Sequence, residues 1–152
     1  MRLEESGRFT VDVPPGEAVD YLADAEALPG CLPGEVHGVE PRDDGGVSVE
    51  LTARYAGASE DVRVRMYVEA VDREAGRVAY TGHGLGSRAK VDLDGEFDLS
   101  AQDGGTRVEW RGAADVGGLL SSLNRGVAAS AVSDKLAEAA ENVRAELESL
   151  GD

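Results

Sequence analysis

The chain has 152 residues and a mass of 15.9 kDa, the size of one ordinary domain. Its 30 acidic and 15 basic residues give a net charge of −15, which disfavours binding to nucleic acid or to an anionic membrane. One cysteine excludes an internal disulfide, and no apolar run is long enough for a membrane span or a signal peptide. We therefore expect one soluble, cytoplasmic domain over residues 1–152.

The basic residues are unusual in kind. Only Lys90 and Lys135 are lysines, and the other thirteen bases are arginines. The acids are scattered along the chain, and 41% of the residues are hydrophobic, which argues against a disordered acidic segment. We interpret the composition as the acidic shell of a folded protein from a halophilic organism, because concentrated salt screens the repulsion among its acids.

The N-terminal part begins with a predicted strand within residues 3–13, in which Phe9, Val11 and Val13 alternate with polar residues. Two prolines end this strand at residues 14–15. Helical spacing then predicts a short helix over 16–23 and a second helical turn over 25–28, which Pro29 ends. Residues 29–34 form a rigid, apolar loop.

The remainder of the chain changes from period two to helical period. Six further strands are predicted around residues 36–41, 47–55, 62–70, 77–85, 89–99 and 107–114. Clean alternation of apolar and polar residues across short turns is typical of an antiparallel sheet with one solvated face. Apolar residues at steps of three to five then predict a helix of about 30 residues over 119–150. The order predicts an α+β helix-grip fold: a curved seven-stranded antiparallel sheet around a long C-terminal helix, with two short helices after the first strand.

The apolar face of the sheet and the facing stripe of the helix are the candidate ligand-binding surface. Small residues such as Gly95 and Gly112 are frequent on these walls, and aromatic residues make up only 5% of the chain. A void of this kind favours an apolar ligand, whereas the alternative is a filled core. Trp110 offers an indole N–H to a ligand carbonyl. The candidate ligand contacts are Leu32, Leu51, Val64, Met66, Tyr80, His83, Val91, Leu93, Phe97, Trp110, Leu119, Leu123 and Val127.

Few residues have the chemistry of a catalytic or metal site. Cys31, His37 and His83 are the only candidates for a nucleophile and base, and Cys31 lies in an apolar loop without a nucleophile-elbow context. Two histidines without ligand spacing do not indicate a metal site. We therefore expect no catalytic residue, no metal and no required cofactor. The glycines in residues 82–86 either bend a strand or leave room for a ligand, and the loop at 31–34 either covers the cavity or packs under the sheet.

Three segments carry a resemblance to a known family. Residues 9–11 with Leu28 and the sequence CLPG at 31–34, the glycine-spaced run GHGLGS at 82–87, and ADVGGLL at 114–120 are similar to the CoxG family of carbon monoxide dehydrogenase subunits. This family belongs to the START, or birch-pollen-allergen-like, SRPBCC superfamily of helix-grip proteins. The resemblance covers essentially the whole chain, and none of the three segments is a catalytic motif.

The resemblance implies a cavity for a lipophilic small molecule and a role beside a molybdenum hydroxylase of the carbon monoxide dehydrogenase type. The first hypothesis is a non-catalytic carrier, with a menaquinone-type quinone or another lipid as its bound molecule. The alternatives are an assembly or recruitment factor that acts by protein contact, and an enzyme of the polyketide cyclase/dehydratase type. Many relatives continue into a hydrophobic tail that this sequence lacks, so any membrane contact is expected to be transient.

Overall fold

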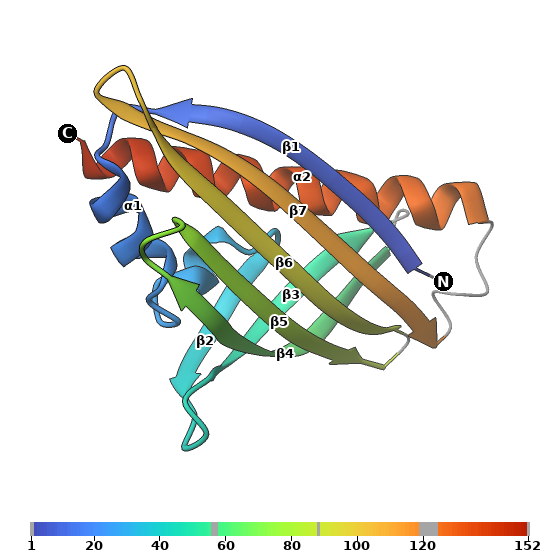
Figure 1. The fold of residues 1–152 in the computed structure, drawn as a ribbon. Coiled ribbons are helices and arrows are strands. Elements are labelled where there is room, and N and C mark those ends of the chain that lie inside the picture. The colour runs from blue at the N-terminus through green and yellow to red at the C-terminus, as the bar shows by residue number, and fades with distance from the viewer. Residues whose placement is uncertain (1, 56–57, 88, 119–124, 152) are drawn as a thin grey trace.

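The computed structural model describes residues 2–55, 58–87, 89–118 and 125–151, without the side chains of 55, 58, 89, 118 and 125–129. Seven strands curve around a long helix (Figure 1). The elements in chain order are β1 (Arg2–Val11), α1 (Pro15–Leu22), the 3-10 helix η1 (Leu28–Cys31), β2 (Glu35–Pro41), β3 (Val47–Tyr55), β4 (Ala58–Asp72), β5 (Arg77–Gly86), β6 (Ala89–Gln102), β7 (Gly105–Gly118) and α2 (Arg125–Leu150).

The strands form one antiparallel sheet in the order β1-β7-β6-β5-β4-β3-β2. Strands β2 to β7 pair with their neighbours in sequence through short turns. The turn between β4 and β5 depends on Gly76, whose φ of 71° favours glycine and whose Cβ, if present, would collide with the Leu99 carbonyl oxygen. This architecture confirms the predicted helix-grip fold.

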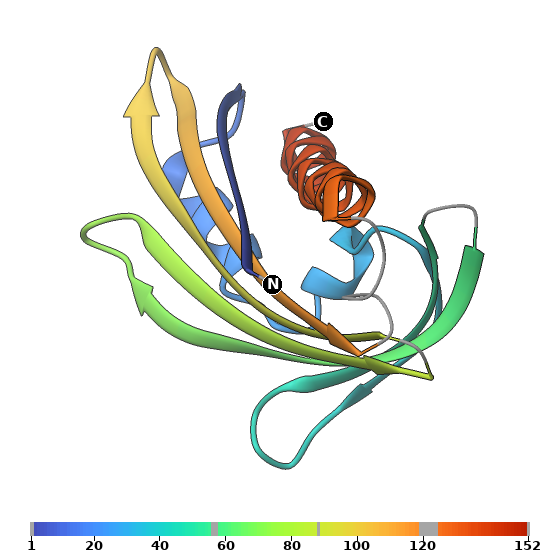
Figure 2. The same cartoon turned by 90° about the vertical axis from the view of Figure 1, so that its right-hand side faces the viewer.

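Helix α2 lies along the open, concave side of the sheet, as the end-on view shows (Figure 2). Its apolar stripe buries Ala140, Val143 and Leu147, and the helix packs chiefly against β1. The main core lies where α1, α2 and strands β1, β5, β6 and β7 meet. The helix was predicted to begin at residue 119, and its first predicted turn, over 119–124, lies outside the described residues.

The two short helices after β1 differ in kind. Helix α1 begins at Pro15, where proline needs no N–H partner, and buries Ala18, Val19 and Leu22. The second was predicted at 25–28, but the structure has a turn there, in which Asp24 accepts the Glu26 N–H at 2.9 Å, followed by η1. Pro29 was expected to end a helix and instead lies in the first turn of η1, because an N–H is not required at that position.

No helix within the described residues is long and apolar enough to cross a membrane.

Candidate functional site

An apolar cavity of about 150 Å³ lies between the sheet and α2. The segment after α1 closes one side of it and the middle turns of α2 form its roof. The lining side chains are almost entirely apolar, so the cavity offers little to a polar ligand. They include Leu28, Cys31, Leu32, Met66, Tyr80, Leu93, Phe97, Trp110, Leu136, Ala139, Ala140 and Val143. Thr81, Asp94 and Arg111 also border the cavity, but they alternate with inward-facing residues on their strands.

Glycines form the floor of this cavity. Gly95 on β6 pairs directly with Gly112 on β7, and Gly82 lies nearby on β5. A Cβ at Gly82 would lie 3.6 Å from the Leu93 Cβ, and one at Gly95 would lie 3.5 Å from the Arg111 carbonyl oxygen. These are ordinary van der Waals contacts, so sterics do not demand glycine at these two positions. The cavity is therefore open because these glycine positions carry no side chains.

Aromatic side chains form one wall. The rings of Tyr80 and Phe97 meet edge to face with centroids 5.6 Å apart, and Phe97 pairs with Trp110 on the next strand. The Trp110 indole lies over Gly7 of β1, where a Cβ would be only 2.8 Å from Nε1. The Tyr80 hydroxyl donates to the Leu22 carbonyl oxygen at 2.5 Å, which ties the wall to the end of α1. Within the described residues no hydrogen bond uses the Trp110 N–H.

Twelve of the thirteen predicted contact residues divide into three groups, and the thirteenth, His83, does not line the cavity. Six line the cavity: Leu32, Met66, Tyr80, Leu93, Phe97 and Trp110. Leu51 and Val64 face inward but pack in a second cluster with Val47 and Val49, and Val91 packs beside a third cluster. Leu119 and Leu123 lie outside the described residues, as does the side chain of Val127.

The family of the chain follows from its sequence. The family model for CoxG, a carbon monoxide dehydrogenase subunit, matches residues 7–148. The chain belongs to the CoxG family. A search of curated proteins found no match.

Solved structures share the fold of this CoxG-family chain at low sequence identity. A conserved protein from Geobacillus kaustophilus superimposes with a TM-score of 0.79 at 17% identity, over 95% of each chain. A START superfamily protein from Mycobacterium smegmatis gives 0.65 at 15% identity, over 97% of this chain and 98% of the other. The Zhui aromatase/cyclase from Streptomyces sp. R1128 gives 0.64 at 17% identity, over 97% and 94%. These likenesses show a START-type fold.

His83 does not lie at the cavity, which corrects the prediction for this residue. Its neighbours Gly82 and Gly84 face inward, so strand alternation turns His83 to the outer face. There its Nδ1 lies 2.9 Å from a carboxylate oxygen of Asp92. His37 is exposed and shares a hydrogen bond of 2.8 Å with Thr52 Oγ1. Neither histidine is thus brought to the buried Cys31.

The glycine run and the loop each have a definite role in the structure. Gly82 lines the cavity, whereas Gly86 makes room for the buried Glu60, whose carboxylate would collide with an added Cβ. The loop at 31–34 is fixed to α2, because the Asn142 side chain donates to the Cys31 carbonyl at 3.1 Å. Leu32 both lines the cavity and packs against the second cluster. The segment is therefore a cavity wall that is also part of the core.

The titratable groups at the cavity stay protonated at neutral pH. Burial raises the pKa of the Cys31 thiol and of the Tyr80 hydroxyl. The Tyr21 hydroxyl, 3.4 Å from Cys31 Sγ, also has a raised pKa because of burial and of that hydrogen bond. A thiol that keeps its proton is a poor nucleophile, so the arrangement favours binding over chemistry.

Helix α2 contributes lining residues, within the described part of the chain, that were not predicted as ligand contacts. The residues of α2 that line the cavity are Leu136, Ala139, Ala140 and Val143. They belong to the same predicted apolar stripe, further along the helix, and the stripe was the available signal for them.

Proposed function

We propose that this chain is a non-catalytic binding and carrier protein for an apolar small molecule. Family membership and the START-type fold both support a ligand-binding domain. The observation that carries the proposal is the glycine-floored cavity, lined by apolar and aromatic side chains. Gly82, Gly95 and Gly112 leave space where a fully packed core would contain larger side chains.

The size of the cavity indicates which part of a ligand enters. A dry apolar cavity of about 150 Å³ holds a molecule the size of benzene, whereas pockets for whole ligands have volumes of about 300–1,000 Å³. The cavity here is about 150 Å³ and open on one side. A ring therefore lies inside, with any longer chain of the ligand extending out of the cavity.

We specify a quinone of the menaquinone type as the ligand. In this proposal the quinone-bearing ring of the head group lies against the glycine floor, beside Ala139, Ala140, Phe97 and Trp110, and the second ring extends toward the opening. The Trp110 N–H donates to a quinone carbonyl. Burial of about 200 Å² of ligand surface contributes about 5 kcal/mol before ordering costs, which is enough for reversible transfer.

The partner in this proposal is a molybdenum hydroxylase of the carbon monoxide dehydrogenase type, because the family takes its name from a subunit of that enzyme. The carrier delivers the quinone, and the redox chemistry belongs to the partner. The same family name favours a second candidate, an assembly or recruitment factor. That factor would bind the enzyme equally well with its cavity blocked, whereas a carrier needs the cavity to support turnover.

The direct test is extraction of the purified protein with organic solvent, followed by mass spectrometry. The proposal expects a quinone or another lipid in stoichiometric amount. Protein that arrives empty is titrated with 2-methyl-1,4-naphthoquinone while the fluorescence of the single tryptophan, Trp110, is followed. Saturable quenching supports the proposal, and an empty protein that shows no saturable quenching contradicts it.

A further inference from the structure

The outer face of the sheet, opposite the cavity, has a hollow of about 950 Å³ over β3 to β6. Its charged and apolar lining includes Arg63, Arg65, His83, Leu85, Lys90 and Asp92. None of these side chains lines the apolar cavity, so the two sites are separate.

Leu85 is the most exposed apolar side chain that lines this hollow. It is 65% exposed, more than any other large hydrophobic side chain among the described residues. In the sheet it pairs with Arg63 on β4 and with Lys90 on β6, so a cation stands on each side of it. An apolar side chain of a partner that covered Leu85 would remove this exposed surface from water.

Two of the three cations that line the hollow form no ion pair within the part of the chain that the structure describes. The structure describes the side chains of thirteen arginines and lysines, of which nine form ion pairs with carboxylates. Among these thirteen, Arg8, Arg54, Arg65 and Lys90 form none, and two of these four line the hollow. In a chain with two acids for every base, an unpaired cation is the exception. The pKa of the Asp92 carboxyl is lowered mainly by its hydrogen bond to His83 and also by the nearby Lys90 and Arg65. Neither cation forms an ion pair with Asp92, so each can still pair with a carboxylate from outside.

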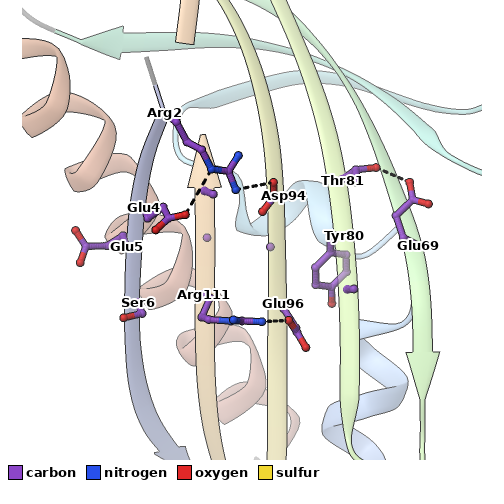
Figure 3. A pocket seen from close by; sticks show the side chains of 14 residues that line it. Arg2, Glu4, Glu5, Ser6, Glu69, Tyr80, Thr81, Asp94, Glu96 and Arg111 are labelled. Carbon is purple, nitrogen blue, oxygen red and sulfur yellow. Dashed lines mark hydrogen bonds and ion pairs between the residues drawn. The ribbon is translucent and has the colours of Figure 1, made fainter. Parts of the chain in front are cut away.

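A neighbouring hollow on the same face shows the contrast (Figure 3). It has a volume of about 570 Å³ over β1, β7, β6, β5 and β4. Its two cations are already neutralised, Arg2 by Asp94 and Asp115 and Arg111 by Glu96. The lining of that hollow has five carboxylates and two cations, whereas the hollow around Leu85 has three of each, so an acidic partner is repelled less at Leu85.

We infer that the hollow around Leu85 is the docking surface for an acidic segment of a protein partner. Carboxylates of that segment pair with Arg65 and Lys90, and an apolar side chain between them covers Leu85. Arg63, already paired with Glu50 at 2.9 Å, and His83, paired with Asp92, form the fixed rim.

A protein segment fits this surface better than a lipid bilayer. A flat membrane does not enter a recess, whereas a loop or helix does. The fixed carboxylates of Glu50 and Asp92 alternate with the cations, which suits discrete ion pairs and opposes a uniformly anionic surface. A second copy of the chain brings a net charge of −15, so repulsion between copies disfavours it as the occupant.

The test places the photo-reactive residue p-benzoylphenylalanine at position 85 and, as control, at the exposed position 100 on the same outer face. After cross-linking in a native-salt lysate, mass spectrometry identifies the protein and peptide captured. The inference expects one protein, specific to position 85, cross-linked through a segment rich in Asp and Glu. Capture of a second copy, of lipid, or of nothing beyond the control overturns it.

The captured protein is then purified and its affinity for this chain is measured. Replacing both Arg65→Gln and Lys90→Gln is expected to weaken binding at least about tenfold and to flatten its dependence on salt. Leu85→Ser is expected to weaken binding without changing that salt dependence. All three side chains are exposed, so these variants fold. Unchanged affinity in the double variant also overturns the inference, and either result leaves the cavity proposal standing.

Discussion

Gly95→Val is a substitution that should fill much of the cavity without disturbing the rest of the fold. The added Cβ has its nearest neighbour at 3.5 Å, and this glycine has no left-handed backbone angle. The Cβ therefore fits without displacing the sheet, and we expect the two methyl groups to extend from it into the cavity. Valine also has a higher strand propensity than glycine.

The structure gives the expected size of the change in stability and of the loss of cavity volume. Three added carbons contribute at most about 2.4 kcal/mol at about 0.8 kcal/mol each, and loss of a strand glycine adds about 0.5 kcal/mol or more. Because the cavity is open on one side, we expect half of the burial, a net gain of about 1–2 kcal/mol in the free energy of unfolding. The same carbons occupy roughly three fifths of the space, since a cavity of about 150 Å³ corresponds to about five waters.

Two measurements check this prediction together. Urea denaturation gives the free energy of unfolding, and quenching of Trp110 by 2-methyl-1,4-naphthoquinone gives the affinity. Gly95→Val is expected to be at least as stable as the parent and to bind at least about tenfold more weakly. Ser100→Val adds apolar atoms on the exposed outer face of the same strand and should leave binding unchanged. A stable Gly95→Val protein with the parent's affinity would refute the assignment of the cavity as the ligand site.

Three other predictions follow from the same contacts. Gly7→Ala brings a Cβ to 2.8 Å from Trp110 Nε1, so we expect a loss of about 1–3 kcal/mol and a shifted tryptophan emission, whereas Gly16→Ala, with nothing within 4 Å, should be neutral or stabilising. The pKa values of Cys31 and Tyr80 are raised on folding, so the unfolded chain loses these protons at a lower pH than the folded chain. Urea titrations should therefore show the free energy of unfolding falling as the pH rises past the ordinary values of 9.0 and 10.0. A constant free energy of unfolding from about pH 7 to about 10.5 would be inconsistent with this. If the acidic shell reflects a salt-rich cytoplasm, the melting temperature should rise steadily between millimolar and molar salt, and a flat profile would refute that interpretation.

Most of the fold was predictable because half-buried strands and an amphipathic helix leave strong patterns. The alternation around Phe97 and Trp110 placed both on the inner face, where they do pair. The error at His83 has a physical cause: Gly82 and Gly84 hold the inward positions of β5, and a glycine has no side chain to mark which face is apolar. The alternation of apolar and polar residues therefore could not predict which face of β5 carries His83.

The position of the cavity along the inner face was harder to predict. Leu51 and Val64 face the same side as Met66, but the curved sheet carries them into a separate cluster. The helical stripe likewise predicted which face of α2 is apolar but not which turn lies above Gly95 and Gly112. That depends on how far the helix slides along the sheet, which is a property of the packed structure.

The pairing of β1 with β7 has a consequence for the order of assembly. Strands β2 to β7 can form as successive local hairpins, whereas β1 joins residues as distant as Arg2 and Asp115. Strand β1 is synthesised well before β7 and so has no partner until β7 follows. Helix α2, which packs on β1, follows later still. The roof of the cavity is therefore completed last, and a hydrophobic molecule present during synthesis meets the open sheet before it is covered.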